Sequence, residues 1–248
     1  MSLAGDLRRT LVRFSYPAVA SYYRSRRSKS CPLPALKFLE VAEPAYRSDF
    51  YTLSRIVETA AAPGCLIAEC GVYRGSTLLG MAHKLAAMRV PDYRLVGFDS
   101  FEGFPEPVPQ DALPDGQYHA RAVKGVFADT SHEYLSRKVR SLGFDKSITL
   151  VKGYFEHTLP AWRDHQFDVV HLDVDLYQSY MTCLDFFYPR TRPGGYIVFD
   201  EYDFSAGVYP GAQKAIDSFL AGKAEKIQRF PEAVNPRYFI VKQPAASR

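Results

Sequence analysis

Two short apolar runs that end abruptly in carboxylates constrain the fold of this chain more than any other feature. They occupy residues 168–175 (DVVHLDVD) and 196–203 (YIVFDEYD). A run of Val, Ile, Leu and Phe without polar alternation is typical of a strand buried on both faces, as in a parallel sheet. We therefore predict an α/β fold in which these two runs are strands of a mostly parallel sheet.

Four carboxylates stand where these two strands end, which is the edge of an open α/β sheet where ligands usually bind. They are Asp173, Asp175, Asp200 and Glu201. Neighbouring strands lie about 5 Å apart, so acids on two adjacent strand ends can share one cation. Crowded acids repel one another unless a positive charge lies among them, and an all-oxygen ligand set favours magnesium over zinc. The pattern predicts a divalent metal site.

The size and composition suit one α/β domain with at most a small appendage. The chain has 248 residues, 47% of them hydrophobic, and no apolar run approaches the roughly 20 residues that a membrane span needs. No secretory signal is visible. Four cysteines form neither a CxxC pair nor a zinc spacing, namely Cys31, Cys65, Cys70 and Cys183. We expect them to be reduced packing residues in a cytoplasmic protein.

The basic charge is concentrated in an N-terminal arm, residues 1–45. Residues 1–30 contain seven basic residues and a single acid, Asp6, interleaved with aromatic and aliphatic side chains. The remainder of the chain is slightly acidic, which argues against nucleic-acid binding by the domain over residues 46–248. The arm could contact an anionic membrane or a partner, or it could fold back as a lid or oligomer contact. Pro17 interrupts a long amphipathic helix, so we favour the second interpretation.

A glycine-rich turn follows the predicted strand 65–71. Gly71 and Gly75 bring the backbone close to whatever lies beyond the strand, although a simple tight turn would show the same residues. The turn lacks the GxGxxG pattern of dinucleotide-binding enzymes and the lysine of a phosphate-binding P-loop. Asp99 ends the next strand, 93–98, about where doubly wound folds place a ribose-binding acid. Turn and acid together predict an adenosine-type cofactor.

The stretch 101–130 contains four prolines and three glycines, which exclude a long helix or a central strand. A loop of this length beside Asp99 suggests a flap over the substrate, and an ordinary surface loop is the alternative. Gly153 to Phe155, after the strand 148–152, would lie against an adenine ring. We predict helices over 46–61, 76–88, 131–142, 179–188 and 210–219. The segments 225–230 and 238–242 are predicted as strands that pair antiparallel.

Five ordered motifs resemble the macrocin O-methyltransferase (TylF/MycF-like) family over roughly residues 48–220. They are ECGVYRG (69–75), DSFEGFP (99–105), VKGYFEHTLP (151–160), HLDVDLYQS (171–179) and PGAQKAID (210–217). The resemblance implies the class I methyltransferase fold, a Rossmann-like, doubly wound sheet with one antiparallel strand near the C-terminus. It implies an S-adenosylmethionine- and Mg²⁺-dependent enzyme that methylates a hydroxyl of a sugar-bearing natural product, and it favours a homo-oligomer.

The resemblance also implies a role for individual residues. Asp173, Asp200 and Glu201 would hold Mg²⁺, and Asp175 would be the general base. The cofactor would be bound by Thr52, Glu69, Gly71, Tyr73, Gly75, Ser76, Asp99, Ser100, Gly153 and Phe155. The family usually has Asp-Asp-Tyr where this chain has Asp200-Glu201-Tyr202, so the ligand role of Glu201 depends on its longer side chain reaching the metal.

Other interpretations remain open from the sequence. A nucleotide-sugar or NAD-dependent enzyme would need the missing GxGxxG turn. A catalytically silent, nucleotide-binding protein anchored at a membrane or partner by the basic arm is a second alternative. His171 precedes the acids and, by strand alternation, is expected to point away from the site as a buried or hydrogen-bonded residue.

Overall fold

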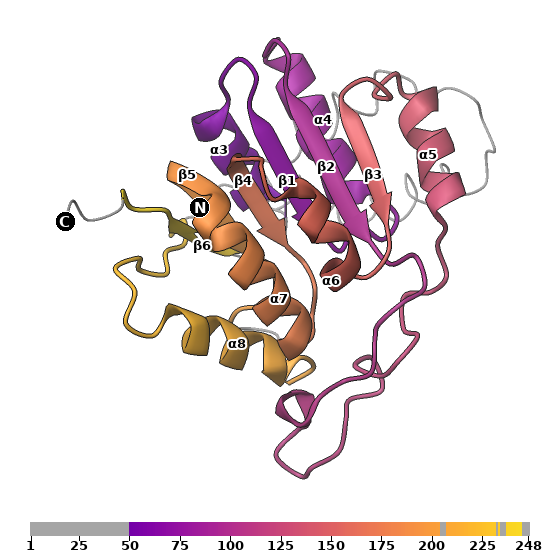
Figure 1. Cartoon of the computed structure of the whole chain (residues 1–248), viewed down its shortest axis with the longest axis vertical. Coiled ribbons are helices and arrows are strands. Elements are labelled where there is room, and N and C mark those ends of the chain that lie inside the picture. Colours follow the sequence, from indigo (N-terminus) through magenta and orange to yellow (C-terminus); the bar gives the residue numbers. More distant parts are fainter. Residues whose placement is uncertain (1–49, 204–206, 232, 234–236, 245–248) are drawn as a thin grey trace, which may run out of the picture.

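Six of the seven predicted strands assemble into one sheet in the computed structural model, which describes residues 50–203, 207–231, 233 and 237–244 (Figure 1). The strand order is β3-β2-β1-β4-β5-β6. The bounds are β1 Leu66–Cys70, β2 Arg94–Asp99, β3 Ile148–Lys152, β4 Phe167–Leu172, β5 Thr191–Phe199 and β6 Tyr238–Val241. The first five strands pair in parallel, and β6 runs antiparallel to β5. The predicted fold class is confirmed, including its antiparallel strand near the C-terminus.

Helices cover both faces of the sheet, as a parallel sheet requires. The helices are α3 Tyr51–Ala60, α4 Ser76–Ala87, α5 His132–Ser141, α6 Phe155–Thr158, α7 Tyr177–Phe187 and α8 Pro210–Leu220. Three short 3-10 turns accompany them, η1 Pro109–Asp111, η2 Leu159–Trp162 and η3 Tyr188–Arg190. Apolar side chains of α3, α4 and α5 form one buried cluster with the sheet, whereas α7 and α8 form another on the opposite face.

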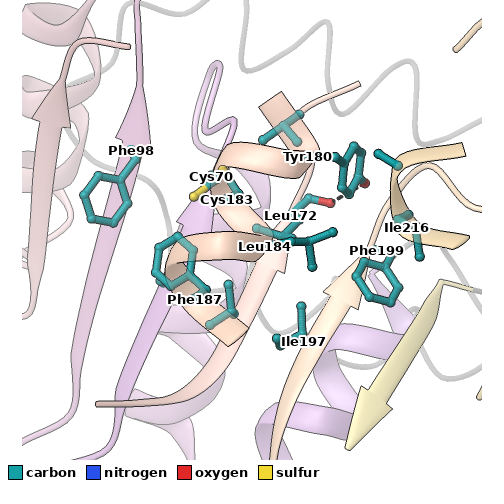
Figure 2. Close-up of a cluster of buried hydrophobic side chains, with 14 of the residues drawn as sticks. Cys70, Phe98, Leu172, Tyr180, Cys183, Leu184, Phe187, Ile197, Phe199 and Ile216 are labelled. Atoms are coloured by element: carbon teal, nitrogen blue, oxygen red, sulfur yellow. Dashed lines mark hydrogen bonds between the residues drawn. The ribbon is translucent and has the colours of Figure 1, made fainter. Parts of the chain in front are cut away.

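Successive side chains of a strand point to opposite faces of the sheet, so each strand contributes residues to both clusters. In β4, Val169 belongs to the cluster of α3 and α4, while its neighbour Val170 belongs to the cluster of α7 and α8. Figure 2 shows the second cluster, where Cys183 of α7 lies beside Cys70 of β1. Cys65, Cys70 and Cys183 are all free and buried, which confirms the packing role predicted for these three. Cys31 lies outside the described residues.

The stretch 101–130 forms a long connection beyond the carboxyl ends of the strands, as Figure 1 shows below the arrowheads of β2 and β3. Its only regular element is η1, which confirms the prediction of an irregular segment. The two stems are joined by backbone hydrogen bonds, because Phe104 donates to the carbonyl of Val126 (3.0 Å) and Gly125 donates to that of Phe104 (3.1 Å). We call this segment the flap.

One predicted strand is absent. Over residues 225–230 the structure has only a single antiparallel bridge, in which Gln228 pairs with Phe239. The carboxylate of Glu225 accepts hydrogen bonds from Tyr188 (2.5 Å), Lys242 (2.9 Å) and the backbone N–H of Gln243 (3.1 Å). These side-chain contacts replace ladder hydrogen bonds at the start of the segment, so the antiparallel pairing was predicted correctly and its length was not.

The arm predicted over residues 1–45 lies outside the described residues. None of the helices described here has the length and apolar character that crossing a bilayer demands.

Candidate active site

Three carboxylates meet where β4 and β5 end. Asp173, Asp175 and Glu201 each place one carboxylate oxygen so that these oxygens all lie within 4.8 Å of one another. Asp173 and Asp175 belong to the turn between β4 and α7, and Glu201 follows β5. Because β4 and β5 are parallel neighbours, their carboxyl ends open onto the same edge of the sheet. The crowding of acids predicted from the two apolar runs is therefore present.

The backbone at Asp175 is bent sharply. Its φ is +58°, and the N–H of Leu176 donates to the carbonyl of Val174 at 2.6 Å, which closes a tight three-residue turn. A non-glycine residue in this region is strained and persists only where its surroundings hold it. Here the Asp175 N–H donates to Oε2 of Glu201 (3.2 Å), and the Tyr180 hydroxyl donates to the same oxygen (2.8 Å). The turn and the end of β5 thus hold each other in place.

Burial and mutual repulsion change the acidity of these three groups. Burial, followed by the charge of Asp200, raises the pKa of Asp173 to about 7. Burial, followed by the charges of the neighbouring acids, raises the pKa of Asp175 and of Glu201 well above their ordinary values. Protons or a cation must offset this charge at neutral pH. An all-oxygen set of carboxylates suits a hard dication such as Mg²⁺.

The fourth predicted acid, Asp200, contacts cations that are part of the protein. Its Oδ1 accepts a hydrogen bond from Nε of Arg237 and lies 3.5 Å from Nε2 of His171. Burial alone would raise the pKa of Asp200, but the contact with His171 and the charge of Arg237 outweigh it and lower that pKa. The structure therefore brings three of the four acids together and holds Asp200 beside them.

His171 links Glu69 on β1 to the acids at the ends of β4 and β5. It lies opposite Glu69 in the β1–β4 register, and its Nδ1 is 2.9 Å from Oε1 of Glu69. Burial lowers the pKa of His171, but Asp200 and Glu69 outweigh that effect and raise it to about 10, which favours the protonated ring. The expectation that His171 is buried and hydrogen-bonded is confirmed. The expectation that it points away from the site is wrong, because residues two apart on a strand share a face and His171 lies 3.5 Å from Asp200 at the edge of the acid cluster.

One carboxylate oxygen of Glu69 makes no hydrogen bond within the described part of the chain. Its side chain is 1% exposed, and Oε2 has no hydrogen-bond partner among the described residues. A buried carboxylate oxygen without a partner is unfavourable unless a ligand completes it. Asp99 lies nearby in the sheet at the end of β2, and each of its oxygens accepts one backbone N–H, from Tyr73 and from Phe101 (both 2.7 Å).

Glycines make the turn after β1 possible. Gly71 has φ +84°, and a Cβ there would lie 1.7 Å from the carbonyl oxygen of Asp173. Gly75 precedes α4 at φ +77°, where a Cβ would meet Leu135 at 2.4 Å. Gly153 follows β3 at φ +136° and donates its N–H to the carbonyl of Asp99 (2.9 Å). The turns after β1 and β3 thus lie beside the ends of β4 and β2.

The other residues predicted for the cofactor have varied surroundings. Thr52 of α3 is fully buried, and its hydroxyl accepts the backbone N–H of Arg237 (3.3 Å). Ser100 donates to the carbonyl of Gly103 (2.8 Å), so its hydroxyl already stabilises the flap stem. The hydroxyl of Tyr73 donates to Asp129 (2.9 Å) at the other end of the flap. Ser76 and Phe155 are the first residues of α4 and α6.

Two residues at the site were not predicted from the sequence. Arg237, which pairs with Asp200, belongs to the tail, and no local pattern distinguishes it from a surface arginine. Tyr209 immediately precedes α8, and it is buried beside Asp175. An aromatic residue directly before the proline that starts a helix is the signal that could have pointed to it.

A model of the family described as macrocin-O-methyltransferase (TylF) matches residues 34–229. The chain belongs to this family. The match covers β1 to β5 and the turns and acids at their ends, and the resemblance inferred from the five motifs is confirmed.

Two curated methyltransferases are similar to this chain. A Streptomyces olivaceus protein named 8-demethyl-8-(2,3-dimethoxy-alpha-L-rhamnosyl)-tetracenomycin-C 4'-O-methyltransferase is 32% identical over 157 residues, 62% of this chain and 60% of the relative. Mycinamicin III 3''-O-methyltransferase of Micromonospora griseorubida is 30% identical over 155 residues, 60% of this chain and 61% of the relative. The chain matches less than two thirds of the length of each relative.

Solved structures show the same architecture. The O-methyltransferase NovP aligns with a TM-score of 0.63 at 27% identity, over 79% of each chain. CalS11, a calicheamicin methyltransferase, aligns with a TM-score of 0.56 at 21% identity, over 85% of this chain and 86% of that one, which shows the fold alone.

Proposed function

We propose that this protein transfers a methyl group from S-adenosylmethionine to a hydroxyl of a sugar-bearing small molecule. The observation that carries the proposal is the contact between Gly71 and the carbonyl of Asp173, which joins the glycine-rich turn to the acid cluster. A cofactor bound on that turn would therefore lie next to the carboxylates. The names of the relatives, which include a rhamnosyl acceptor and a mycinamicin, support this class of acceptor.

The cofactor half of the site fits S-adenosylmethionine. The unpaired, buried Oε2 of Glu69 would accept a hydrogen bond from the ammonium of the methionine part. The carboxylate oxygens of Asp99 each accept one N–H and keep a lone pair for the ribose hydroxyls. Around these two acids the cofactor would be lined by Thr52, Gly71, Tyr73, Gly75, Ser76, Ser100, Gly153 and Phe155.

The acid cluster fits Mg²⁺ through the chemistry of its donors. Asp173 and Glu201 would hold the ion, together with Asp200. The contacts of Asp200 with Arg237 and His171 both use Oδ1. The longer side chain of Glu201 already reaches the oxygens of Asp173 and Asp175, which supports its assignment in spite of the departure from Asp-Asp-Tyr.

Asp175 would then be the general base. When bound, S-adenosylmethionine supplies the methyl group and takes the electron pair of the broken C–S bond, and Mg²⁺ supplies positive charge beside the acceptor oxygen. The carboxylate of Asp175 accepts the proton of the hydroxyl as that oxygen bonds to the methyl carbon. Burial raises the pKa of Asp175, which makes the group a better proton acceptor. The protein's main contribution is to hold the two reactants in line.

Two measurements test this function. S-adenosylhomocysteine should raise the melting temperature and NAD should not, because the turn lacks the dinucleotide pattern. Transfer of labelled methyl from S-adenosylmethionine to sugar-bearing acceptors should then require Mg²⁺. Turnover that persists in EDTA would contradict the role of the metal, and stabilisation by NAD instead would contradict the whole proposal.

A further inference from the structure

Four charged side chains form a row across one face of the sheet, at its carboxyl edge. Glu69 of β1 lies opposite His171 of β4 in the strand register, Asp200 directly follows β5, and Arg237 directly precedes β6. The residues two positions away on the same strands all belong to the apolar cluster of α3 and α4, namely Ile67, Val169, Val198 and Phe239. Because residues two apart on a strand share a face, the row lies on the face that α3 and α4 cover.

The contacts within the row hold the imidazole of His171 from two sides. Its Nδ1 lies 2.9 Å from Oε1 of Glu69, and its Nε2 lies 3.5 Å from Oδ1 of Asp200. An ionised carboxylate can only accept, so Nδ1 is the donor toward Glu69. At the far end, Arg237 donates to the same oxygen of Asp200, and its backbone N–H donates to Thr52 of α3. The position of the ring is therefore set within the protein.

Strand pairing gives Glu69 a single neighbour with a polar side chain. On β4 that neighbour is His171, whereas on β2 it is Gly97, which has no side chain to offer. A glutamate has three rotatable bonds, and fixing them costs entropy that a contact must offset. Both partners are only 1% exposed, so bulk water cannot take the place of either. The hydrogen bond through Oε1 consequently determines where the second oxygen, Oε2, points.

The second oxygen of Glu69 is the end of the row that the protein leaves open. Oε2 is buried and has no hydrogen-bond partner in the part of the chain that the structure describes. Such an oxygen is unfavourable unless a ligand completes it. Under the proposed function its partner is the ammonium of the methionine part of the cofactor.

We propose that His171 is a positioning residue for the cofactor, because its hydrogen bond to Oε1 aims Oε2 of Glu69 at that ammonium. This inference rests on the proposed function. It assigns His171 to the binding of the amino-acid part of S-adenosylmethionine, whereas the adenosine part would not depend on it.

The first test compares two amides at position 171. Asparagine places its amide nitrogen near the position of Nδ1 and can still donate to Glu69, whereas glutamine places its amide nitrogen near the position of Nε2, on the side of Asp200. His171→Gln should weaken the binding of S-adenosylhomocysteine by about 10- to 100-fold, since it removes a hydrogen bond to a charged group. His171→Asn should restore the affinity to near the wild-type value. Calorimetric titration of the full chain measures both, and equal affinities in the two variants would overturn the inference.

A second ligand shows whether the loss lies in the amino-acid part. Methylthioadenosine shares the adenosine and the sulfur of S-adenosylhomocysteine and lacks its ammonium. His171→Gln should bind methylthioadenosine about as tightly as the wild type does. A loss for methylthioadenosine as large as that for S-adenosylhomocysteine would show a general disturbance of the site and would overturn the inference.

The wild-type protein offers a measurement that does not depend on how the variants fold. With isotopic labels at the histidine nitrogens, S-adenosylhomocysteine should shift the Nδ1 resonance of His171, which Glu69→Gln assigns, and methylthioadenosine should leave it in place. A resonance that S-adenosylhomocysteine does not move would overturn the inference alone. A wild-type protein that fails to bind S-adenosylhomocysteine would contradict the proposed function and this inference with it.

Discussion

The backbone of Gly71 lies against Asp173, where the glycine-rich turn meets the acid cluster. A Cβ at this position would lie 1.7 Å from the carbonyl oxygen of Asp173, and φ is +84°. Two separate requirements, space and backbone conformation, therefore exclude every other residue. The sequence alone suggested that the glycine lets a ligand approach, and the structure shows that it first lets a neighbouring strand end approach.

Gly71→Ala should lower the free energy of unfolding by about 3 kcal/mol or more, because it adds a collision with backbone to the strain of positive φ. Gly143→Ala is the matched control, since Gly143 has φ +77° and a Cβ there would have no other atom within 4 Å. That variant should lose only about 1 kcal/mol. Urea unfolding of both variants measures the difference, and equal losses would contradict the collision with Asp173.

The roles of Asp173 and Asp175 are separable by substitution. If Asp173 is a metal ligand and Asp175 the base, Asp173→Asn should weaken Mg²⁺ binding at least about tenfold. Asp175→Asn should leave Mg²⁺ affinity nearly unchanged and lower turnover by about 10²- to 10⁴-fold. Calorimetric titration with Mg²⁺ and methyl-transfer rates distinguish the two. Because the oxygens of both residues lie within 4.8 Å of Glu201, an equal loss of affinity would make Asp175 a ligand.

At the scale of elements, the flap is tied to the helices beneath it by one buried acid. Asp111 of η1 is 1% exposed, and its carboxylate accepts the N–H of Tyr177 at the start of α7 (2.7 Å) and that of Val108 (2.9 Å). Its Oδ1 also lies so near Gly211 of α8 that a Cβ there would be 1.9 Å away. A negative charge at a helix N-terminus is favourable, so this contact fastens the flap to α7.

Asp111→Ala should release the flap, because it leaves the N–H of Tyr177 without its partner. Trypsin should then cleave after Arg121 or Lys124 several times faster than in the wild type. Asp115→Ala is the control, since Asp115 is exposed and bonds only within the flap, to the N–H of Gln117 (3.0 Å). Gel analysis of a proteolysis time course gives the rates, and equal rates in both variants would contradict the anchoring role of Asp111.

The elements were predictable where their signal is local. The apolar runs around Val170 and Ile197 identified central strands, and the change from apolar to acidic residues marked their carboxyl ends. The pairing of Asp200 with Arg237 was not predictable, because it joins positions 37 residues apart through two strand ends. The same limit applied to His171, whose partner on the neighbouring strand depends on the register of β1 and β4.

At the scale of the whole molecule, Glu225 joins the C-terminal tail to the body. The group is 4% exposed and accepts hydrogen bonds from Tyr188 and Lys242. Burial alone would raise its pKa, but these hydrogen bonds outweigh burial and lower the pKa from 4.5 to about 2. A carboxylate whose pKa is lower in the folded state than in the unfolded state stabilises the protein at pH values above its unfolded-state pKa. That stabilisation is lost as the pH falls through the folded-state pKa.

Glu225→Gln should therefore be about 2 kcal/mol less stable than the wild type at pH 6, because it leaves the partly buried charge of Lys242 without its partner. The difference should shrink as pH falls from about 4.5 toward 2. Denaturant unfolding of both proteins at pH 6 and pH 3 measures it. Glu102→Gln, which alters an exposed pair with Lys152 (3.2 Å), should differ little from the wild type at either pH. A difference that grows in acid would contradict the prediction.

Two buried residues of the flap, Asp111 and Ala122, flank the ten residues 112–121. None of these ten residues is buried. Residues 112–121 can therefore be exchanged between relatives without opening a hole in either apolar layer. Under the proposed function, such chimaeras would change the surface that meets the acceptor while the acids and the glycine-rich turn stay the same.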